Sequence, residues 1–268
     1  MSLRPLNQMP LEVAQSVHTV LLDIDDTLTT HGRLTAPAYT ALQRLQAAGL
    51  RVIPITGRPA GWCDHIARMW PVDGVVGENG ALYLWMDRAE GRLRRRDFAS
   101  GHEGPALQAR LAAVRERILR EVPGCGVASD QFCRLYDLAI DFCEDVPALP
   151  PEAVDRIAAL MREAGMTAKI SSIHVNGWFG DWDKLAMAQK MLAERHGIDL
   201  PTERERIVFV GDSPNDEPMF AAFPHAVGVA NVADHLHRLE HRPTWITHER
   251  AGAGFVEVAD LLIGCREP

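Results

Sequence analysis

The stretch Leu21-Leu-Asp-Ile-Asp-Asp-Thr-Leu28 decides the fold, because a short apolar run ends there abruptly in carboxylates. The run starts at His18 and continues as Thr-Val-Leu-Leu. A continuous apolar run, unlike an alternating one, is typical of a strand that is buried on both faces of a parallel sheet. Ligands of open parallel sheets bind at the carboxyl ends of the strands. The stretch therefore predicts a central strand with a functional site at its end.

Strands and helices alternate on the carboxyl side of this stretch. The sequence predicts a helix over 35–49, a second strand over 51–56, a helix over 58–70 and a third strand over 72–77. This alternation is typical of a parallel sheet with right-handed crossovers. We therefore expect an α/β fold with a Rossmann-like parallel-sheet core.

The pattern changes between residues 81 and 182 and then returns. The middle section predicts a hairpin around 87–91, helices over 105–121 and 151–164, and strands over 133–142 and 168–179. The predicted elements after it are helices over 184–196, 217–222 and 233–240, a helix from 255, and strands over 207–211, 226–230 and 245–247. We therefore expect a discontinuous core, 1–85 and 184–268, with an inserted α+β cap domain over 86–183.

The composition is that of a soluble globular protein of 268 residues, 47% of them hydrophobic. The net charge of −8 argues against nucleic acid as a partner, because phosphate backbones attract basic surfaces. No apolar run is long enough for a membrane span, and residues 1–10 do not resemble a signal peptide. The five cysteines form no CxxC pair, which favours a reducing compartment. We expect a cytoplasmic monomer or homodimer.

Four separated segments carry polar residues where the parallel strands are predicted to end. They are the stretch with Asp23 and Asp25; Thr56-Gly57-Arg58; Lys184, which opens the helix after the insertion; and Asp212-Ser-Pro-Asn215-Asp216. Each segment alone is typical of an ordinary loop or helix end. Their order along the chain, and their positions at strand ends, favour one common site.

Four carboxylates in one cleft (Asp23, Asp25, Asp212 and Asp216) would repel one another strongly unless a cation were bound. A set of oxygen ligands with few carboxylates suits Mg²⁺ better than zinc. A divalent ion together with Lys184 would attract an anion into an otherwise acidic protein. Phosphoryl transfer needs a nucleophile, a metal that bridges oxygens, and donors around the phosphoryl group. The set therefore predicts phosphoryl-transfer chemistry with Mg²⁺ as cofactor.

The four segments resemble the four motifs of the haloacid dehalogenase (HAD) superfamily. The long insert between the second and third motifs resembles the Cof-like subfamily IIB, which includes sugar-phosphate phosphatases. Gly77-Glu-Asn-Gly-Ala81 and Gly228-Val-Ala-Asn231 resemble further segments of that family. The resemblance implies a Mg²⁺-dependent phosphatase that hydrolyses a small phosphorylated metabolite, such as a sugar phosphate, through an aspartyl-phosphate.

The resemblance also implies roles for individual residues. Asp23 would be the nucleophile and Asp25 the general acid and base. The phosphoryl group would be bound by Thr56, Gly57, Lys184 and Asn215, and the metal by Asp23, the backbone carbonyl of Asp25, Asp212 and Asp216. Asp26 stands where the family usually has glycine, which indicates an unusual backbone angle or an additional charge in the loop.

Substrate specificity is expected to depend on the cap. Arg58 and three polar residues of the strand predicted over 168–179, namely Ser171, His174 and Asn176, are candidate specificity residues. The alternative for the three cap residues is ordinary cross-strand pairing. Two other functions remain open, a hexose phosphomutase of the same superfamily and a non-catalytic regulator that binds a phosphorylated metabolite.

Overall fold

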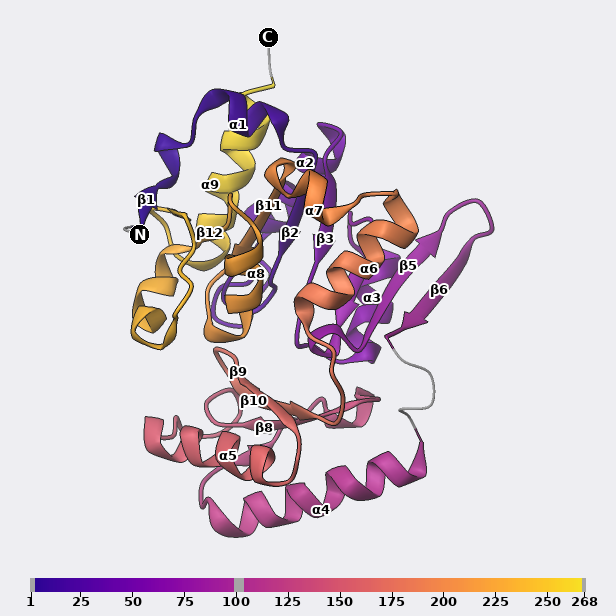
Figure 1. Cartoon of the computed structure of the whole chain (residues 1–268), viewed down its shortest axis with the longest axis vertical. Coiled ribbons are helices and arrows are strands. Elements are labelled where there is room, and N and C mark those ends of the chain that lie inside the picture. Colours follow the sequence, from indigo (N-terminus) through magenta and orange to yellow (C-terminus); the bar gives the residue numbers. More distant parts are fainter. Residues whose placement is uncertain (1–2, 99–103, 267–268) are drawn as a thin grey trace.

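The structure is a computed structural model, and it describes residues 3–98 and 104–266. Figure 1 shows two parts, an α/β core above and the inserted segment with α4 (Pro105–Glu121) and α5 (Pro151–Glu163) below it. The α/β core with an inserted α+β part confirms the predicted fold class. Among the described residues, none of the helices combines the length and apolar character that a membrane span requires.

The core is built on a six-stranded sheet in the order β1-β13-β12-β11-β2-β3, with parallel neighbours throughout. Its strands are β1 (Arg4–Pro5), β2 (Thr19–Leu22), β3 (Arg51–Pro54), β11 (Ile207–Gly211), β12 (Val227–Gly228) and β13 (Trp245–Ile246). All four residues of β2 are buried. The continuous apolar run at 18–22 thus forms a strand covered on both faces, as predicted.

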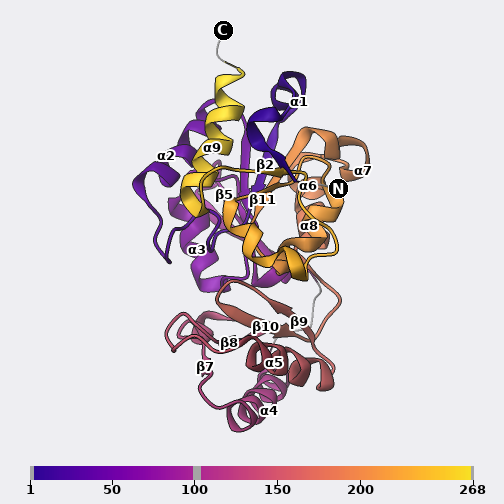
Figure 2. The same ribbon diagram turned by 90° about the vertical axis from the view of Figure 1, so that its left-hand side faces the viewer.

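Successive residues of β2 point to opposite faces of the sheet, and each face has its own core. Val20 and Leu22 pack with α2 (Ala36–Ala47), α3 (Ala60–Met69) and α9 (Ala251–Gly264). Leu21 packs with α6 (Lys184–His196) and α8 (Glu217–Ala222) on the other face. The short helices α1 (Leu11–Ser16) and α7 (Leu200–Glu203) contact α9 and α6. Figures 1 and 2 show these helices on the two sides of the sheet.

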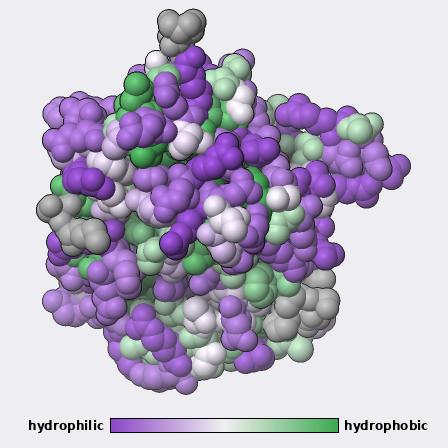
Figure 3. Space-filling view, turned by 45° about the horizontal axis from the view of Figure 1, so that its top comes forward, coloured by the Kyte–Doolittle hydropathy of each residue, from purple (hydrophilic) through white to green (hydrophobic). Residues whose placement is uncertain are grey.

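The third predicted strand is shorter than expected and belongs to a different sheet. Here β4 (Val75–Gly77) pairs antiparallel with β5 (Leu82–Asp87), which pairs with β6 (Arg92–Asp97). A single parallel bridge between Ile55 and Val76 joins β4 to the end of β3. The hairpin is confirmed, and it projects from the core as a largely hydrophilic arm (Figure 3). Because the hairpin pairs with core strands, we propose that the first core segment extends to Asp97, beyond the expected boundary at 85.

The cap consists of a four-stranded antiparallel sheet with α4 and α5 on one face (Figure 2). Its strands, in the order β7-β8-β10-β9, are β7 (Gly126–Val127), β8 (Asp137–Asp141), β10 (His174–Trp178) and β9 (Thr167–Ile170). The other sheet face is turned toward the carboxyl ends of the core strands. The insertion thus covers the edge of the core at which the sequence predicts a site.

Several predicted element bounds were wrong. The strand predicted over 168–179 is two strands joined by a turn, so Ser171 lies in the turn. The strand predicted over 133–142 begins only at Asp137, and the helix predicted over 233–240 is a 3-10 helix, Ala230–Arg238. The last helix starts at Ala251, not 255, and its first turn contains Gly252. Glycine is required there because a Cβ would lie 2.6 Å from the carbonyl oxygen of Leu28.

Gly80 fixes the contact between the loop after β4 and the start of α6. Its φ is +107°, and a Cβ there would lie 2.0 Å from the carbonyl oxygen of Asp183, directly before Lys184. We expect Gly80→Ala to lower the free energy of unfolding by about 2–4 kcal/mol, because backbone strain and a steric clash add. Gly91→Ala is the matched control, since Gly91 has φ +64° and a Cβ there would meet no atom within 4 Å. Urea unfolding measures the free energy of unfolding of both variants. Equal losses in the two would contradict the close contact between Gly80 and Asp183.

Candidate active site

Three neighbouring strands of the core end in the predicted site residues. Asp23 follows β2, Thr56 lies two residues after β3, and Asp212 follows β11. The sheet order β11-β2-β3 makes these strands adjacent, and the backbone N–H of Asp23 donates to the carbonyl oxygen of Val210 at 2.9 Å. The carboxyl ends of the three strands therefore meet at one edge, the edge at which open parallel sheets bind their ligands.

The loop after β2 turns sharply and separates Asp23 from Asp25. The carbonyl oxygen of Ile24 accepts from the backbone N–H groups of Leu28 and Thr29, each at 2.9 Å. Asp26 takes φ +54° in this turn. Aspartate tolerates the left-handed region better than most residues do, which explains how it replaces the glycine usual in the family.

A buried lysine lies at the centre of the site. Lys184 is 2% exposed, and its Nζ donates to Asp23 Oδ1 at 2.9 Å and to Asp216 Oδ1 at 2.6 Å. Asp183 caps the N-terminus of α6 by accepting from the N–H of Ala186, which fixes the helix start that carries the lysine. Burial alone would lower the pKa of Lys184, but Asp216 and Asp23 outweigh it and hold that pKa above its ordinary value. The two carboxylates therefore favour the charged form of Lys184.

One group of three acidic side chains in residues 3–98 and 104–266 is close enough to share a metal ion. Oxygens of Asp23, Asp212 and Asp216 all lie within 4.8 Å of one another. Burial is the main cause that raises the pKa of Asp23 to about 7, against the influence of Lys184. Burial and the neighbouring Asp216 and Asp23 also raise the pKa of Asp212. An all-oxygen donor set whose carboxylates are hard to ionise together fits Mg²⁺.

The three carboxylates are not equally free to bind a metal. Asp216 uses one oxygen for Lys184 and accepts the backbone N–H of Asp212 with the other, at 3.1 Å. Asp212 is oriented by single hydrogen bonds from Thr27 Oγ1 and Asn231 Nδ2, each at 3.1 Å. Thr27 and Asn231 were not predicted as site residues. Only the match of 228–231 to a family segment pointed toward Asn231.

Asp25 lies apart from this group. Its carboxylate accepts from Arg58 Nε at 3.0 and 3.1 Å and from Nη2 at 2.9 Å. Its carboxylate is thus engaged by Arg58, while the predicted metal ligand is the backbone carbonyl of Asp25. Burial would lower the pKa of Arg58, but Asp25 and Glu144 raise it above its ordinary value.

The predicted phosphoryl-binding residues also lie near the carboxyl ends of the core strands. Thr56 is fully buried, and its Oγ1 accepts from the N–H of Arg58 at 3.0 Å, which leaves the hydroxyl proton for another acceptor. The carbonyl oxygen of Gly57 accepts from Arg134 Nη1 of the cap at 2.8 Å. Asn215 is held by Ser213, whose Oγ donates to Asn215 Oδ1 at 2.7 Å.

A small cavity of about 10 Å³, room for about one water molecule, lies between core and cap. Its lining is Asp23, Asp25, Gly57, Arg58, Asn215 and, from the cap, Ser171, Ile173, His174 and Asn176. The four predicted specificity residues thus face the predicted nucleophile. In the described part of the chain this lining does not include Thr56, Lys184, Asp212 or Asp216.

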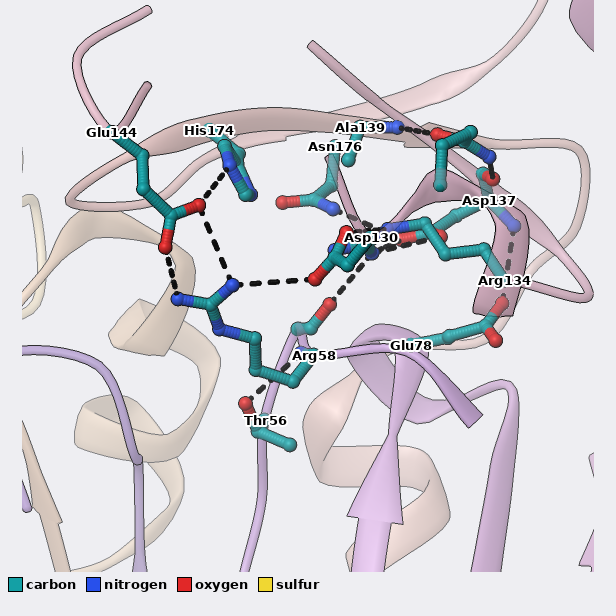
Figure 4. Close-up of polar contacts among 12 residues, drawn as sticks. Thr56, Arg58, Glu78, Asp130, Arg134, Asp137, Ala139, Glu144, His174 and Asn176 are labelled. Atoms are coloured by element: carbon teal, nitrogen blue, oxygen red, sulfur yellow. Dashed lines mark hydrogen bonds and ion pairs between the residues drawn. The ribbon is translucent and has the colours of Figure 1, made fainter. Parts of the chain in front are cut away.

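A buried polar network, which the sequence did not predict, joins core and cap (Figure 4). Glu78, at φ +45°, accepts from the backbone N–H groups of Leu135, Tyr136 and Asp137 in the cap at 2.7–3.2 Å. Arg134 of the cap pairs with Asp137 and Asp130. Burial, and next Asp137, raise the pKa of Glu78 to about 7. The cap is therefore closed by hydrogen bonds that converge on one core carboxylate.

The raised pKa values of Asp23 and Asp212 predict how stability depends on pH. A carboxyl group whose pKa is raised by folding stabilises the protein below its unfolded pKa, near 4, and this stabilisation is lost as the pH rises through the folded value. We therefore expect Asp212→Asn, relative to the metal-free wild type, to gain melting temperature between pH 5 and pH 8. We also expect Mg²⁺ to stabilise the wild type at pH 8 and to lose this effect in the variant.

Differential scanning calorimetry with EDTA or with Mg²⁺ tests both expectations. Asp64→Asn serves as the control, because Asp64 is 47% exposed and pairs only with Arg68 among the described residues. If the difference in melting temperature between Asp212→Asn and the wild type stays constant across this pH range, the carboxyl groups of Asp23, Asp212 and Asp216 do not lose stability by ionising together, and the expectation is wrong.

Comparisons with known proteins agree with this geometry. A family model described as haloacid dehalogenase-like hydrolase matches residues 20–98. The phosphoglycolate phosphatase of Pyrobaculum neutrophilum is 29% identical over 248 residues, covering 91% of this chain and 95% of the relative. That of Methanoculleus marisnigri is 27% identical over 246 residues, covering 89% and 94%. The C-terminal domain of the C. albicans trehalose-6-phosphate phosphatase shares the fold, with a TM-score of 0.72 and 15% identity over 98% of each chain.

The matching segment contains most of β2, all of β3 and two of the four predicted motifs, and the matches to the relatives extend over core and cap alike. The fold shared with the trehalose-6-phosphate phosphatase domain covers 98% of this chain, so it includes the cap as well as the parallel sheet. The chain is thus similar to haloacid dehalogenase-like hydrolases over residues 20–98 and to phosphoglycolate phosphatases over 89–91% of its length.

Proposed function

We propose that the protein is a Mg²⁺-dependent phosphatase that hydrolyses a small phosphorylated metabolite through an aspartyl-phosphate on Asp23. One observation carries the proposal. The Asp23 carboxylate faces the cavity that Asp25 also lines, and it is paired with the buried Lys184 and lies within metal-sharing distance of Asp212. The phosphoglycolate phosphatases among the relatives support the same reaction class.

In the first step, an Asp23 oxygen attacks phosphorus, and the bond from phosphorus to the ester oxygen breaks. Asp25 supplies the proton that the leaving oxygen needs, and Arg58 holds its carboxyl group in place. Lys184 and the hydroxyl of Thr56 neutralise the phosphoryl oxygens as charge develops on them. The products are a free alcohol and phosphorylated Asp23.

In the second step, water attacks the phosphorus of the aspartyl-phosphate. Asp25, now ionised, accepts a proton from that water while the bond from phosphorus to the Asp23 oxygen breaks. Inorganic phosphate leaves, and both carboxyl groups return to their starting states. The cap covers this edge of the core and so limits the access of bulk water to it.

Mg²⁺ would be held by Asp23, Asp212 and the backbone carbonyl of Asp25. When bound, it neutralises the cluster and polarises the phosphoryl oxygens. Asp216 acts differently in this proposal, because both of its oxygens are engaged by Lys184 and by backbone N–H groups. Its role is to hold Lys184 and the loop after β11 in position.

A cytoplasmic location is part of the proposal. All five cysteines are free, although Cys63 is fully buried and the others are partly so. Free thiols persist in reducing compartments, which supports this location.

Asp23→Asn tests the nucleophile. We expect the variant to lose phosphate release by at least about a thousandfold, because an amide oxygen is a poor nucleophile at phosphorus. A colorimetric phosphate assay on a panel of phosphate esters, with Mg²⁺ and with EDTA, measures this. Asp64→Asn, on the exposed face of α3, is the control and keeps wild-type rates.

The same assay separates the alternatives. Substantial Mg²⁺-dependent hydrolysis by Asp23→Asn would remove Asp23 from its role. Isomerisation of a hexose phosphate without phosphate release would identify a mutase, and a wild type that binds phosphate esters but turns none over would identify a regulator.

A further inference from the structure

Asp26 occupies an unfavourable position for a carboxylate. Its φ of +54° lies in the left-handed region that favours glycine. Its side chain is half-buried, and burial is the main cause that raises its pKa, while a hydrogen bond from the Ser172 hydroxyl of the cap lowers it. Residues that keep an unfavourable backbone angle cluster at functional sites. The contact with Ser172 therefore indicates a role for Asp26 between core and cap.

The backbone of Asp26 is held in the core. Its N–H donates to Thr29 Oγ1 at 3.2 Å, and its carbonyl oxygen accepts from Asn231 Nδ2 at 2.9 Å. The same amide group of Asn231 donates to Asp212, one of the three carboxylates that can share a metal. The Asp26 side chain therefore starts from a point that is fixed relative to the acidic group.

Ser172 lies in the turn between β9 and β10, and this turn is fixed within the cap. Ser171 Oγ accepts from the backbone N–H of His174 at 3.0 Å, and the N–H of Ser171 donates to the carbonyl oxygen of His174 at 2.9 Å. Cys143 Sγ donates to the carbonyl oxygen of Ser172 at 3.4 Å, which joins the turn to the loop after β8. Two well-held segments thus meet through the side chains of Asp26 and Ser172.

These two segments form the boundary between the small cavity and a larger hollow. Asp25 lines the cavity, whereas the next residue, Asp26, lines a hollow of about 320 Å³. In the turn, Ser171 and Ile173 line the cavity, whereas Ser172 between them lines the hollow. The hydrogen bond between Asp26 and Ser172 therefore joins the two sides of the boundary.

The hollow connects the surface with the acidic group. Its lining includes Asp212, which is buried, and three exposed residues, His31, Asp234 and Arg250. The cavity on the other side of the boundary has room for about one water molecule, so a phosphate ester reaches Asp23 only after core and cap separate. Parting of the boundary would join the cavity to the hollow and open a path from the surface to the proposed nucleophile.

We propose that the hydrogen bond between Asp26 and Ser172 is a latch that holds the cap turn over Asp23, and that its opening admits the phosphate ester. Asp26 is a positioning residue in this proposal, because it contacts the cap turn and not the reacting atoms. The kinetic part rests on the proposed phosphatase function, whereas the hold on the turn does not. Glycine, the usual residue of the family motif at this position, has no side chain to form such a latch.

The latch is weaker than two other contacts that hold the cap. Glu78 is fully buried and accepts three backbone N–H groups of the cap, and Arg58 pairs with two cap carboxylates. The latch is one hydrogen bond between two half-buried side chains. Because water competes for partly exposed polar groups, the latch opens more easily than the contacts of Glu78 and Arg58. Opening of the cap therefore begins at the turn.

Two single variants and their combination test the latch. Asp26→Gly removes the acceptor and suits the backbone angle, so the fold should remain, and Ser172→Ala removes the donor from the cap side. We expect each variant to raise the KM for 2-phosphoglycolate and for p-nitrophenyl phosphate by about fivefold, with kcat within about twofold, because the ester must then close the cap without the latch. The double variant should lose no more than either single variant, since both remove the same hydrogen bond.

Hydrogen exchange reports on the turn without any substrate. We expect the backbone N–H groups of Ser171 and His174 to exchange about fivefold faster in both single variants, because the turn opens more often without the latch. Peptides from α2 serve as the internal reference and should exchange at the wild-type rate. Asp26→Asn keeps an oxygen acceptor and tolerates the left-handed angle, so it should retain most of the protection that Asp26→Gly loses.

Asp234→Asn is the matched control. It removes the same charge from another residue that lines the hollow, one that is 56% exposed and paired with Arg250. Its KM values and the exchange of the turn should equal those of the wild type.

The outcomes separate the latch from the phosphatase function. If both variants exchange faster at the turn but the wild type hydrolyses no ester, the hold on the turn is supported and the phosphatase function fails. If Asp26→Gly lowers kcat while Ser172→Ala leaves exchange and KM unchanged, Asp26 acts within its own loop and the latch is wrong. If neither variant changes the exchange of the turn, the latch is also wrong, whatever the rates of hydrolysis.

Discussion

The pairing of Lys184 with Asp23 and Asp216 is the interaction on which the rest of the site depends. A cation and two carboxylates are buried together, and each would be strongly destabilising if it were left alone. The pairing joins the start of α6 to the ends of β2 and β11, segments that are 161 and 32 residues apart in the chain. It therefore fixes the proposed nucleophile, the proposed phosphoryl-binding cation and the neighbouring acidic loop in a single unit.

Buried ion pairs also hold the cap against the core. One of them involves Arg58, which binds the proposed acid Asp25 as well as the cap. Arg58 binds Asp25 in the core and both Asp130 and Glu144 in the cap. The backbone of the cap is anchored separately, by the Glu78 carboxylate. Movement of the cap would thus disturb the group that orients the proposed acid, whereas the Lys184 unit lies wholly within the core. This division suits an enzyme that must open for its substrate and keep its phosphoryl site intact.

Asp23, Thr56 and Asp212 were predictable because each follows a strand that the hydrophobic pattern of the sequence reveals. The apolar run before Asp23, and Ile207–Gly211 before Asp212, gave the sheet edge and hence the meeting of both carboxylates. Asp26 shows where a departure from the family pattern is absorbed, by a left-handed backbone angle. Glu144, Arg134 and Asp130 lie in loops and short segments of the cap, where ion pairs between distant residues leave no periodic signal.

By itself the sequence determined the α/β class, the inserted cap and the set of residues at the strand ends, since burial on both sheet faces and the order of motifs are local properties of the chain. Only the tertiary structure decided how those residues divide the work. It grouped Asp212 and Asp216 with Asp23, turned Asp25 toward Arg58, and paired Glu144 of the cap with both Arg58 and His174. The physical reason is that electrostatic pairing acts through space, so its partners are chosen by packing and not by spacing along the chain.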